Sequence, residues 1–240
     1  MEPIGIWLLS IGLGDMIAGY SGEVATKTRG WWAWGIGSAA TLSVALLGGL
    51  CWSAALGLMA WSCLTLGLWL WARLPETWSA SRAAAILGGV AGAAVVFALS
   101  GGWWPEAGNG AIERLIDELP YPVLSGQSQG RVLTILGALL FLQATANALV
   151  RSLLAVVGTP EADQSLRGGR FIGPMERTLI FGLGVSGYLT AAAVVATAKG
   201  LLRFPEISKE DKTNIHAATE YFLVGSLASW ILALAPLALL

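Results

Sequence analysis

The stretch WWAWGIGSAATLSVALLGGLCWSAALGLMAWSCLTLGLWLW, residues 31–71, carries no charged residue over 41 positions. A helix needs ~20 residues to cross the hydrocarbon core of a bilayer, so the stretch is too long for one span and fits two. Gly48 and Gly49 stand at its midpoint and are typical of a turn. Tryptophans begin and end the stretch, and because indole rings favour the membrane interface, both ends are expected at one membrane surface. The stretch therefore predicts two antiparallel transmembrane helices.

The rest of the chain shares this apolar character. Its 240 residues are 55% hydrophobic and 12% charged, with a mean hydropathy of +0.68, whereas a soluble domain carries about 25% charged residues. The chain begins without the basic segment of a signal peptide, so its first apolar run is expected to be a retained helix. We predict an all-α, polytopic transmembrane helical bundle that forms one integral membrane domain over residues 1–240. Further apolar runs cover residues 4–20, 83–102 and 132–150, and a last run begins near Glu220.

A short amphipathic helix is expected at residues 111–119. Ile112, Leu115, Ile116 and Leu119 follow an i, i+3, i+4, i+7 pattern, and charged residues occupy the opposite face. Such a helix lies on the membrane surface or on the bundle.

Two of the apolar runs carry glycines at helical spacing. Gly12 and Gly19 lie in the first run, and Gly88 and Gly92 lie in the run at residues 83–102. Glycine faces let another helix approach closely. They predict contacts with a partner membrane protein or with a second copy, and the sequence does not separate these contacts from packing within the chain.

Three polar residues stand inside apolar runs. Asp15 is costly at membrane depth and could be an ion or proton site. We favour a residue near the interface at a helix end, capped by the following linker. Gln143 and Asn147 lie four residues apart on one helix face. Their amides are expected to bond to neighbouring helices, although they could also line a polar path.

The number of spans depends on residues 178–198. If every apolar run crosses once, there are seven straight spans with the N-terminus outside, and the basic residues divide eight inside against six outside. If residues 178–198 form a re-entrant hairpin that turns near Val185, Ser186 and Gly187, the division becomes twelve against two. Cytoplasmic loops carry an excess of basic residues, so we prefer six spans plus the hairpin. Residues 178–198 are also long enough for one straight span, which stays the alternative.

The hairpin model brings charged residues together at the cytoplasmic interface. Oppositely charged groups at low dielectric pair, and such pairs are costly to break singly. We expect a charge cluster that clamps the hairpin to the last helix, with solvated helix ends as the alternative. Its members would be Glu176, Arg177, Lys199, Arg203 and Glu220.

Three blocks in residues 169–240 carry a family pattern. They are GRFIGPMER at residues 169–177, AKGLLRF at residues 198–204 and EYFLVGS at residues 220–226. With this spacing, the last third resembles the C-terminal part of a family of uncharacterised bacterial inner-membrane proteins, whereas the N-terminal bundle at residues 1–157 departs from that family. The resemblance implies the bacterial cytoplasmic (inner) membrane and brings no activity with it.

The sequence offers little for catalysis. His216 is the single histidine, and Cys51 and Cys63 lie in apolar segments, where small packing residues are expected. No metal site, cofactor or nucleic acid is therefore expected. We predict a non-enzymatic accessory or interaction subunit of a membrane complex in the lipid bilayer. The alternative is a small-solute or ion transporter or channel with its site at the glycine-broken hairpin.

Overall fold

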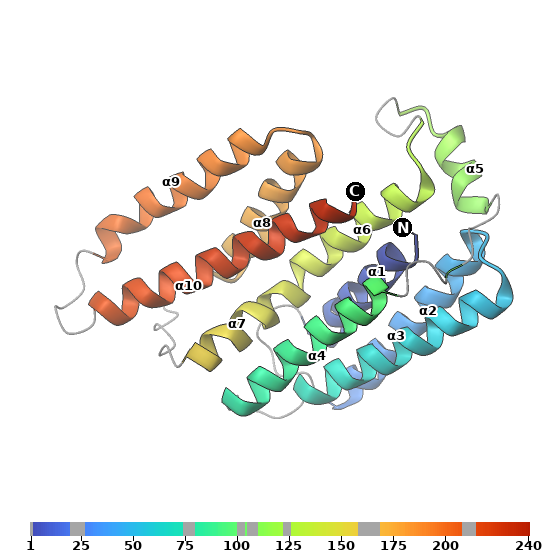
Figure 1. Ribbon diagram of the computed structural model, residues 1–240, viewed down its shortest axis with the longest axis horizontal. Helices are drawn as coiled ribbons and strands as arrows, with labels where there is room; N and C mark the ends of the chain where they lie inside the picture. Colours follow the sequence, from blue (N-terminus) through green and yellow to red (C-terminus); the bar gives the residue numbers. More distant parts are fainter. Residues whose placement is uncertain are drawn as a thin grey trace.

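The computed structural model describes residues 2–19, 27–73, 80–99, 104, 110–121, 126–157, 169–207 and 215–240. These ranges form ten α-helices and one short 3₁₀ helix without a strand, which confirms the all-α class (Figure 1). The helices are α1 Glu2–Ala18, α2 Lys27–Leu47, α3 Trp52–Arg73, α4 Ala80–Leu99, α5 Ala111–Glu118, α6 Gln129–Gln143, α7 Thr145–Val157, α8 Gly169–Val185, α9 Leu189–Ile207 and α10 Ile215–Leu234, followed by the 3₁₀ helix η2 Ala235–Leu239.

Three helices are long and apolar enough to cross a membrane. The qualifying segments are Trp52–Ala72 in α3, Ala80–Phe97 in α4, and Thr219–Leu239 in α10 and η2. The bent pair of α6 and α7 adds a fourth if it is counted as one span. Large apolar side chains are exposed along these helices, as expected of surfaces that face lipid. These features support the membrane class.

The expected hairpin in residues 31–71 is present. α2 ends at Leu47 and α3 begins at Trp52, and the turn contains Gly48 and Gly49. Gly49 has a φ of 83°, a backbone conformation that residues with a Cβ rarely adopt. The predicted position of the turn is therefore confirmed.

Helix α1 is packed closely against α6. A Cβ added to Gly5 would lie 2.6 Å from the Thr134 nitrogen, and one added to Gly12 would lie 2.6 Å from the Leu140 carbonyl carbon. Glycine at both positions lets the two backbones approach each other. Gly12 was expected in a surface for a partner, but the backbone of α6 already fills the space beside it. Gly19 follows Ala18, the last residue of α1, so it lies outside the helix and adds nothing to a helical face.

Helix α5 has the predicted amphipathic character. It covers residues 111–118, with Ile116 buried and the acidic side chains exposed. Gly110, just before it, lies against Gly48 and Leu47, so α5 rests on the turn between α2 and α3. The helix therefore lies against the end of the bundle, which is one of its two expected positions (Figure 1).

The run at residues 132–150 does not form the single straight helix that was expected. α6 ends at Gln143, α7 begins at Thr145, and the two helices are bent by 49° at Ala144. No glycine or proline stands at the break, so the usual sequence signal for a kink is missing.

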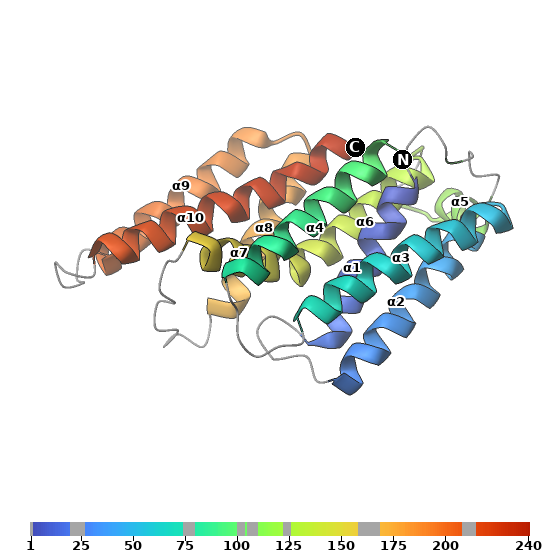
Figure 2. The ribbon, with the colours of Figure 1, turned by 60° about the horizontal axis from the view of Figure 1, so that its bottom comes forward.

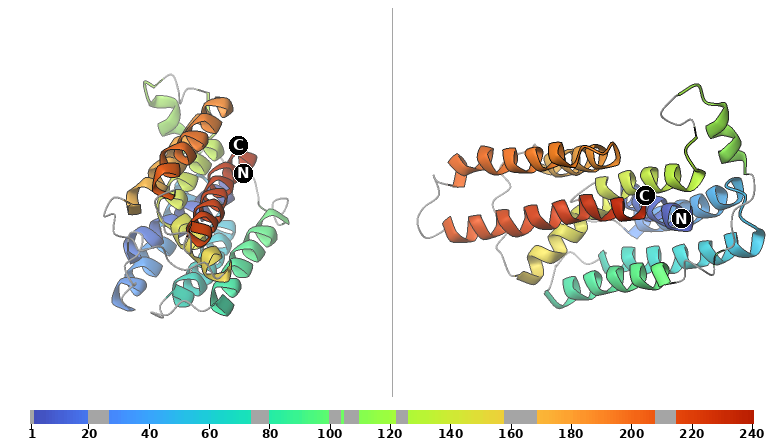
Figure 3. Two further views of the ribbon diagram at one scale, coloured as in Figure 1. Left: turned by 90° about the vertical axis from the view of Figure 1, so that its left-hand side faces the viewer. Right: turned by 45° about the horizontal axis from the view of Figure 1, so that its top comes forward.

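The chain reverses at the predicted residues 185–187. α8 ends at Val185, and α9 begins at Leu189 after a turn in which Gly187 has a φ of 82°. The two arms have 17 and 19 residues, or about 26 and 28 Å, so the hairpin is deeper than the predicted 178–198. Its far end reaches the end of α10, where Gly184 contacts Leu237 (Figure 3).

Both chain termini lie at the same end of the bundle. They are side by side in three different views (Figures 1–3). Leu239 packs against the core cluster that contains Ile6 and Trp7, close to the start of α1.

Candidate functional site

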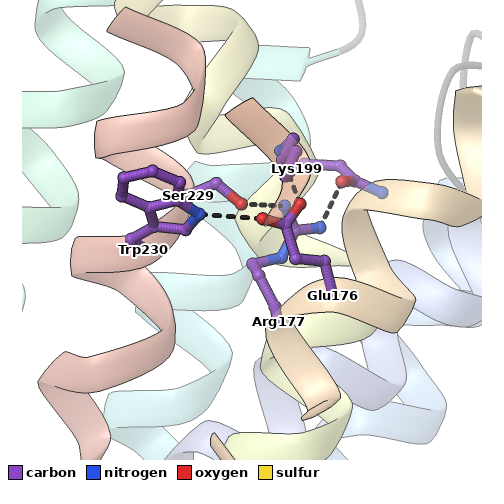
Figure 4. Close-up of polar contacts among 6 residues, drawn as sticks. Glu176, Arg177, Lys199, Ser229 and Trp230 are labelled. Carbon is purple, nitrogen blue, oxygen red and sulfur yellow. Dashed lines mark hydrogen bonds and ion pairs between the residues drawn. The ribbon is translucent and has the colours of Figure 1, made fainter. Parts of the chain in front are cut away.

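The side chain of Arg177 is buried at the centre of the C-terminal half. It is 2% exposed and extends from α8 toward α7 and α10 (Figure 4). Its Nε donates to the Leu142 carbonyl at 3.1 Å, its Nη1 donates to the Ser229 hydroxyl at 3.2 Å, and its Nη2 donates to the Asn147 Oδ1. One guanidinium therefore connects the end of α6, the start of α7 and the C-terminal half of α10.

These bonds satisfy backbone groups that the helix break releases. A break in a helix leaves carbonyl oxygens without their usual amide donors, and in a bilayer each unsatisfied group costs several kcal/mol, on the order of 2–7. Arg177 donates to the Leu142 carbonyl, and the Asn147 side chain donates to the Gln143 carbonyl at 3.4 Å. The Asn147 amide bonds to the Ala144 carbonyl in a tightened turn. Side chains thus replace the missing helical bonds at the break.

The two predicted intramembrane amides both reach α8. The Gln143 Nε2 donates to the Thr178 hydroxyl at 2.5 Å, and Asn147 accepts from Arg177. These are bonds to a neighbouring helix, the favoured expectation for both residues.

Glu176, next to Arg177, makes a separate cluster. Lys199 on α9 forms an ion pair with the Glu176 Oε2 at 2.5 Å, and the Trp230 indole on α10 donates to the Oε1 at 2.8 Å (Figure 4). The Glu176 side chain is 7% exposed and that of Lys199 is 24% exposed. The expected pair of Glu176 and Lys199 is present, and it joins the two arms of the hairpin to the last helix.

The membership and position of this cluster differ from the expectation. Helix α10 contributes Trp230 to Glu176 and Ser229 to the separate bonds of Arg177. Glu220 is exposed ten residues before Trp230, about 15 Å along the helix. The Arg203 side chain lies outside the described residues. Because the arms are longer than predicted, Glu176 is the eighth of 17 residues in α8 and Lys199 the eleventh of 19 in α9. The pair therefore lies halfway along the hairpin and not at its base.

Asp15 is also inside the bundle, which corrects the favoured expectation of an interfacial residue capped by its linker. It is 0% exposed. The Trp69 indole donates to its two oxygens at 2.8 and 2.9 Å, and the Thr145 hydroxyl donates to Oδ2 at 2.6 Å. These two donors belong to α3 and α7, so the close packing of α1 on its neighbours brings the carboxylate within reach of other helices.

Several contributors to these sites were missed by the sequence interpretation. Trp69 was assigned to an interfacial aromatic belt, yet it is 5% exposed and serves Asp15, whereas Trp71 is 72% exposed and fits the belt. Thr145 and Ser229 were not singled out, because a lone hydroxyl in an apolar run carries no local signal. Trp230 was equally unmarked.

The described residues contain no group of three histidine, cysteine, aspartate or glutamate side chains that could hold a metal ion. No family model, curated protein or solved structure matches the chain. The site therefore has to be interpreted from its own geometry.

Proposed function

We propose that this chain is a non-enzymatic interaction subunit of a membrane complex, and that it receives a transmembrane helix of its partner on α4. The observation that carries the proposal is the open face of α4. A Cβ added to Gly88 or Gly92 would meet nothing within 4 Å, whereas Gly5 and Gly12 of α1 lie directly against α6.

The open face is continuous along α4. Ala84, Gly88 and Gly92 follow each other at four-residue intervals, and the exposed side chains of Val95 and Leu99 extend the face toward the end of the helix. Lipid tails are as apolar as the side chains of a helix, so the hydrophobic effect does not drive helices together within a bilayer. Close packing of small residues stabilises their association instead.

The opposite face of α4 holds it to the rest of the protein. Ala83, Ile86 and Phe97 are buried there, and Figure 2 shows α4 on the outside of the bundle. The rest of the bundle therefore holds α4 in place, and the outer face of α4 is available to a partner helix.

The polar clusters fit the same proposal. Arg177 and Glu176 each bond to several helices of the chain, and these bonds stabilise the bundle from inside. This arrangement is typical of a packed scaffold.

The proposed topology has six spans, namely α1, α2, α3, α4, the bent pair α6–α7, and α10, together with the deep α8–α9 hairpin, which enters and leaves the bundle from the cytoplasmic side. The N-terminus is outside, as the distribution of basic residues favours, and the membrane is the bacterial inner membrane, as the family resemblance implies. Support comes from the shared end of the two termini, since six spans and a hairpin return the chain to its starting side (Figure 1).

The hairpin also carries an apolar outer surface over the length of α8. Phe171, Met175 and Leu179 are 55%, 69% and 50% exposed, while Glu176 and Arg177 between them are directed inward. Because its charged side chains face inward and its apolar side chains face outward, α8 can contact lipid from its first turn onward.

The experiment is native purification of the wild type and of variants with a blocked α4 face. Gly88→Leu and Gly92→Leu fill the open face, and Gly57→Leu is the matched control, because Gly57 is an exposed α3 glycine that also meets nothing within 4 Å. We expect a stoichiometric partner with the wild type and the control, and its loss from both α4 variants at an unchanged melting temperature. A partner retained by the α4 variants, or a homo-oligomer of this chain alone, contradicts the proposal.

A transporter or channel is the second candidate, and the α6–α7 break favours it. Discontinuous helices near the midplane form substrate sites in transporters, and here a 49° break lies beside Arg177 and Asn147. The broken helix is α6–α7, however, and not the glycine-containing hairpin that was expected to carry the site. Flux into proteoliposomes that contain the purified chain alone tests this candidate.

A further inference from the structure

One layer inside the N-terminal bundle consists of buried hydroxyl side chains. Ser10 on α1, Thr41 on α2 and Ser62 on α3 are each 0% exposed. The Ser10 hydroxyl donates to the Gly37 carbonyl of α2 at 3.0 Å, and the Thr41 hydroxyl donates to the same oxygen at 3.0 Å. Two of the three hydroxyl groups therefore gather at a single backbone oxygen.

Contacts one helical turn away place Ser62 at the level of this oxygen. The Leu66 methyl carbons of α3 would lie 2.8 Å from a Cβ added to Gly14 of α1 and 2.6 Å from one added to Gly37. Since α2 runs back between them, α1 and α3 point in the same direction (Figure 2). Ser10 is four residues before Gly14, which is about one turn. Ser62 is likewise four residues before Leu66, so it stands opposite Ser10 on the face of α3 that Leu66 occupies.

The protein supplies fewer partners than these polar groups require. Among the residues that the structure describes, the Ser62 Oγ and the Ser38 Oγ are buried side-chain atoms without a hydrogen-bond partner. A hydroxyl group has one proton to donate and two lone pairs that accept. Ser10 and Thr41 use their protons on the Gly37 carbonyl, so their oxygen atoms can still accept. Ser62 thus has a proton to donate and does not reach these acceptors.

The hydroxyl layer lies between two layers of large apolar side chains. Leu66 fills the layer on one side, and Leu58, four residues before Ser62, is 0% exposed on the other side. A buried water molecule needs a polar site, two to four polar partners and room for about one probe sphere. Short hydroxyl side chains from three helices supply the polar partners, and they occupy less space than leucines would at the same positions.

We propose that this layer binds a water molecule, which accepts from the Ser62 hydroxyl and donates to the hydroxyl oxygens of Ser10 and Thr41. Inside a bilayer no bulk solvent reaches a buried hydroxyl group, so a bound water supplies the missing partner. The water connects α3 to α1 and α2 through one set of hydrogen bonds. The proposal goes beyond the proposed function and does not depend on it.

Hydroxyl-radical footprinting detects a bound water directly. X-ray irradiation converts bound water into hydroxyl radicals, which oxidise the nearest side chains, and mass spectrometry locates the products. We expect oxidation of Leu58 and Leu66 in the purified wild type, although both side chains are 0% exposed. Ser62→Ala removes the donor to the water and should abolish the oxidation of both leucines.

The melting temperature shows whether the Ser62 hydroxyl has a partner. Ser62→Ala should lower it by about 2–4 °C, the effect of losing one hydrogen bond in a chain of this length. A hydroxyl buried without a partner predicts a higher melting temperature after the substitution, because alanine leaves no polar group unsatisfied. A hydroxyl that turns to a carbonyl of its own helix predicts no change.

Ser152→Ala is the matched control for both measurements. Ser152 is also 0% exposed, but its hydroxyl donates to the Ala148 carbonyl of its own helix at 2.9 Å. This substitution should change neither the melting temperature nor the oxidation of Leu58 and Leu66. The proposal is overturned by a wild type in which neither leucine is oxidised, by oxidation that survives Ser62→Ala, or by a melting temperature that Ser62→Ala raises or leaves unchanged.

Discussion

Asp15 and Arg177 hold opposite sides of the same helix break. Asp15 accepts from Thr145, and Arg177 donates to Leu142 and Asn147, so a carboxylate on α1 and a guanidinium on α8 both bond to residues 142–147. Residues 145 and 147 are separated by about 200° around a helix, which is why their side chains reach different neighbours. The break is thus held from two directions by groups of opposite charge.

Removal of Arg177 is expected to destabilise the fold strongly. Arg177→Ala leaves the buried Leu142 carbonyl and the Asn147 oxygen without this donor, and such losses reduce the free energy of unfolding by about 3 kcal/mol. Unfolding in detergent, followed by circular dichroism, measures the change. Arg114→Ala is the matched control, because Arg114 is exposed on α5 and should cost less than about 0.5 kcal/mol. Equal effects of the two substitutions would contradict the structural role.

The ion pair in the hairpin predicts a compensating double substitution. Lys199→Met leaves the buried Glu176 charge without its cation and should lower stability by about 1–3 kcal/mol, because Lys199 is only 24% exposed. Adding Glu176→Gln removes the uncompensated charge and should restore most of the loss, since Trp230 can still donate to the amide oxygen.

A double-mutant cycle from melting curves gives the coupling energy of this pair. Glu220→Gln is the control, because Glu220 was expected from the sequence to belong to the charge cluster but is exposed on α10. This substitution should leave the melting temperature unchanged. If the two single effects simply add, Glu176 and Lys199 are not coupled.

Much of this fold was predictable from local signals, and the parts that were missed are tertiary. The turns at Gly49 and Gly187 coincide with glycines that interrupt apolar runs, so they could be placed from sequence. The break at Ala144 could not, because the surrounding Gln143 and Asn147 suggest polarity but no kink. What stabilises it is a guanidinium from α8, which no local pattern reveals.

The same reasoning explains the outcome for the candidate site. Glu176 and Lys199 were expected to pair because they flank residues 178–198, and a hairpin brings the two ends of that segment together. Trp69 was separated from Asp15 by 54 residues, so its role depends on the packing of α1 against α3. The ion pair lies near the middle of the hairpin because both arms are longer than predicted. Hydropathy alone did not mark the ends of these helices, since their inner faces carry polar residues.

Cys51 provides a test of the orientation of the bundle. It is exposed in the turn between α2 and α3. Its hydrogen bond with the Ser53 hydroxyl lowers the pKa of its thiol, and the hydrogen bond with the Ala54 amide lowers that pKa by a smaller amount. A larger thiolate fraction near neutral pH makes it react with maleimides below the ordinary thiol pKa of about 8.5. With the N-terminus outside, a membrane-impermeant maleimide should label it in intact cells.

Two substitutions make this labelling specific. Cys51→Ser in a Cys63→Ser background should abolish the label. Ser53→Ala removes the largest cause of the shift, so the pKa of Cys51 rises and the pH of half-maximal labelling moves upward. Labelling that requires permeabilised cells would place the turn inside and reverse the proposed orientation.

The position of the C-terminus distinguishes the hairpin topology from seven straight spans. Six spans with a hairpin return Leu240 to the outer side, where the proposed topology also places the N-terminus. Alkaline phosphatase fused to Leu240 should then be active, and a reporter that works only in the cytoplasm should be silent. A fusion after Val157 is the internal control, because five spans precede it and the pattern should invert. Seven straight spans predict the opposite at Leu240 and the same result at Val157. A strong cytoplasmic signal from the Leu240 fusion would therefore exclude the hairpin, since the shared end of the two termini requires an even number of passes.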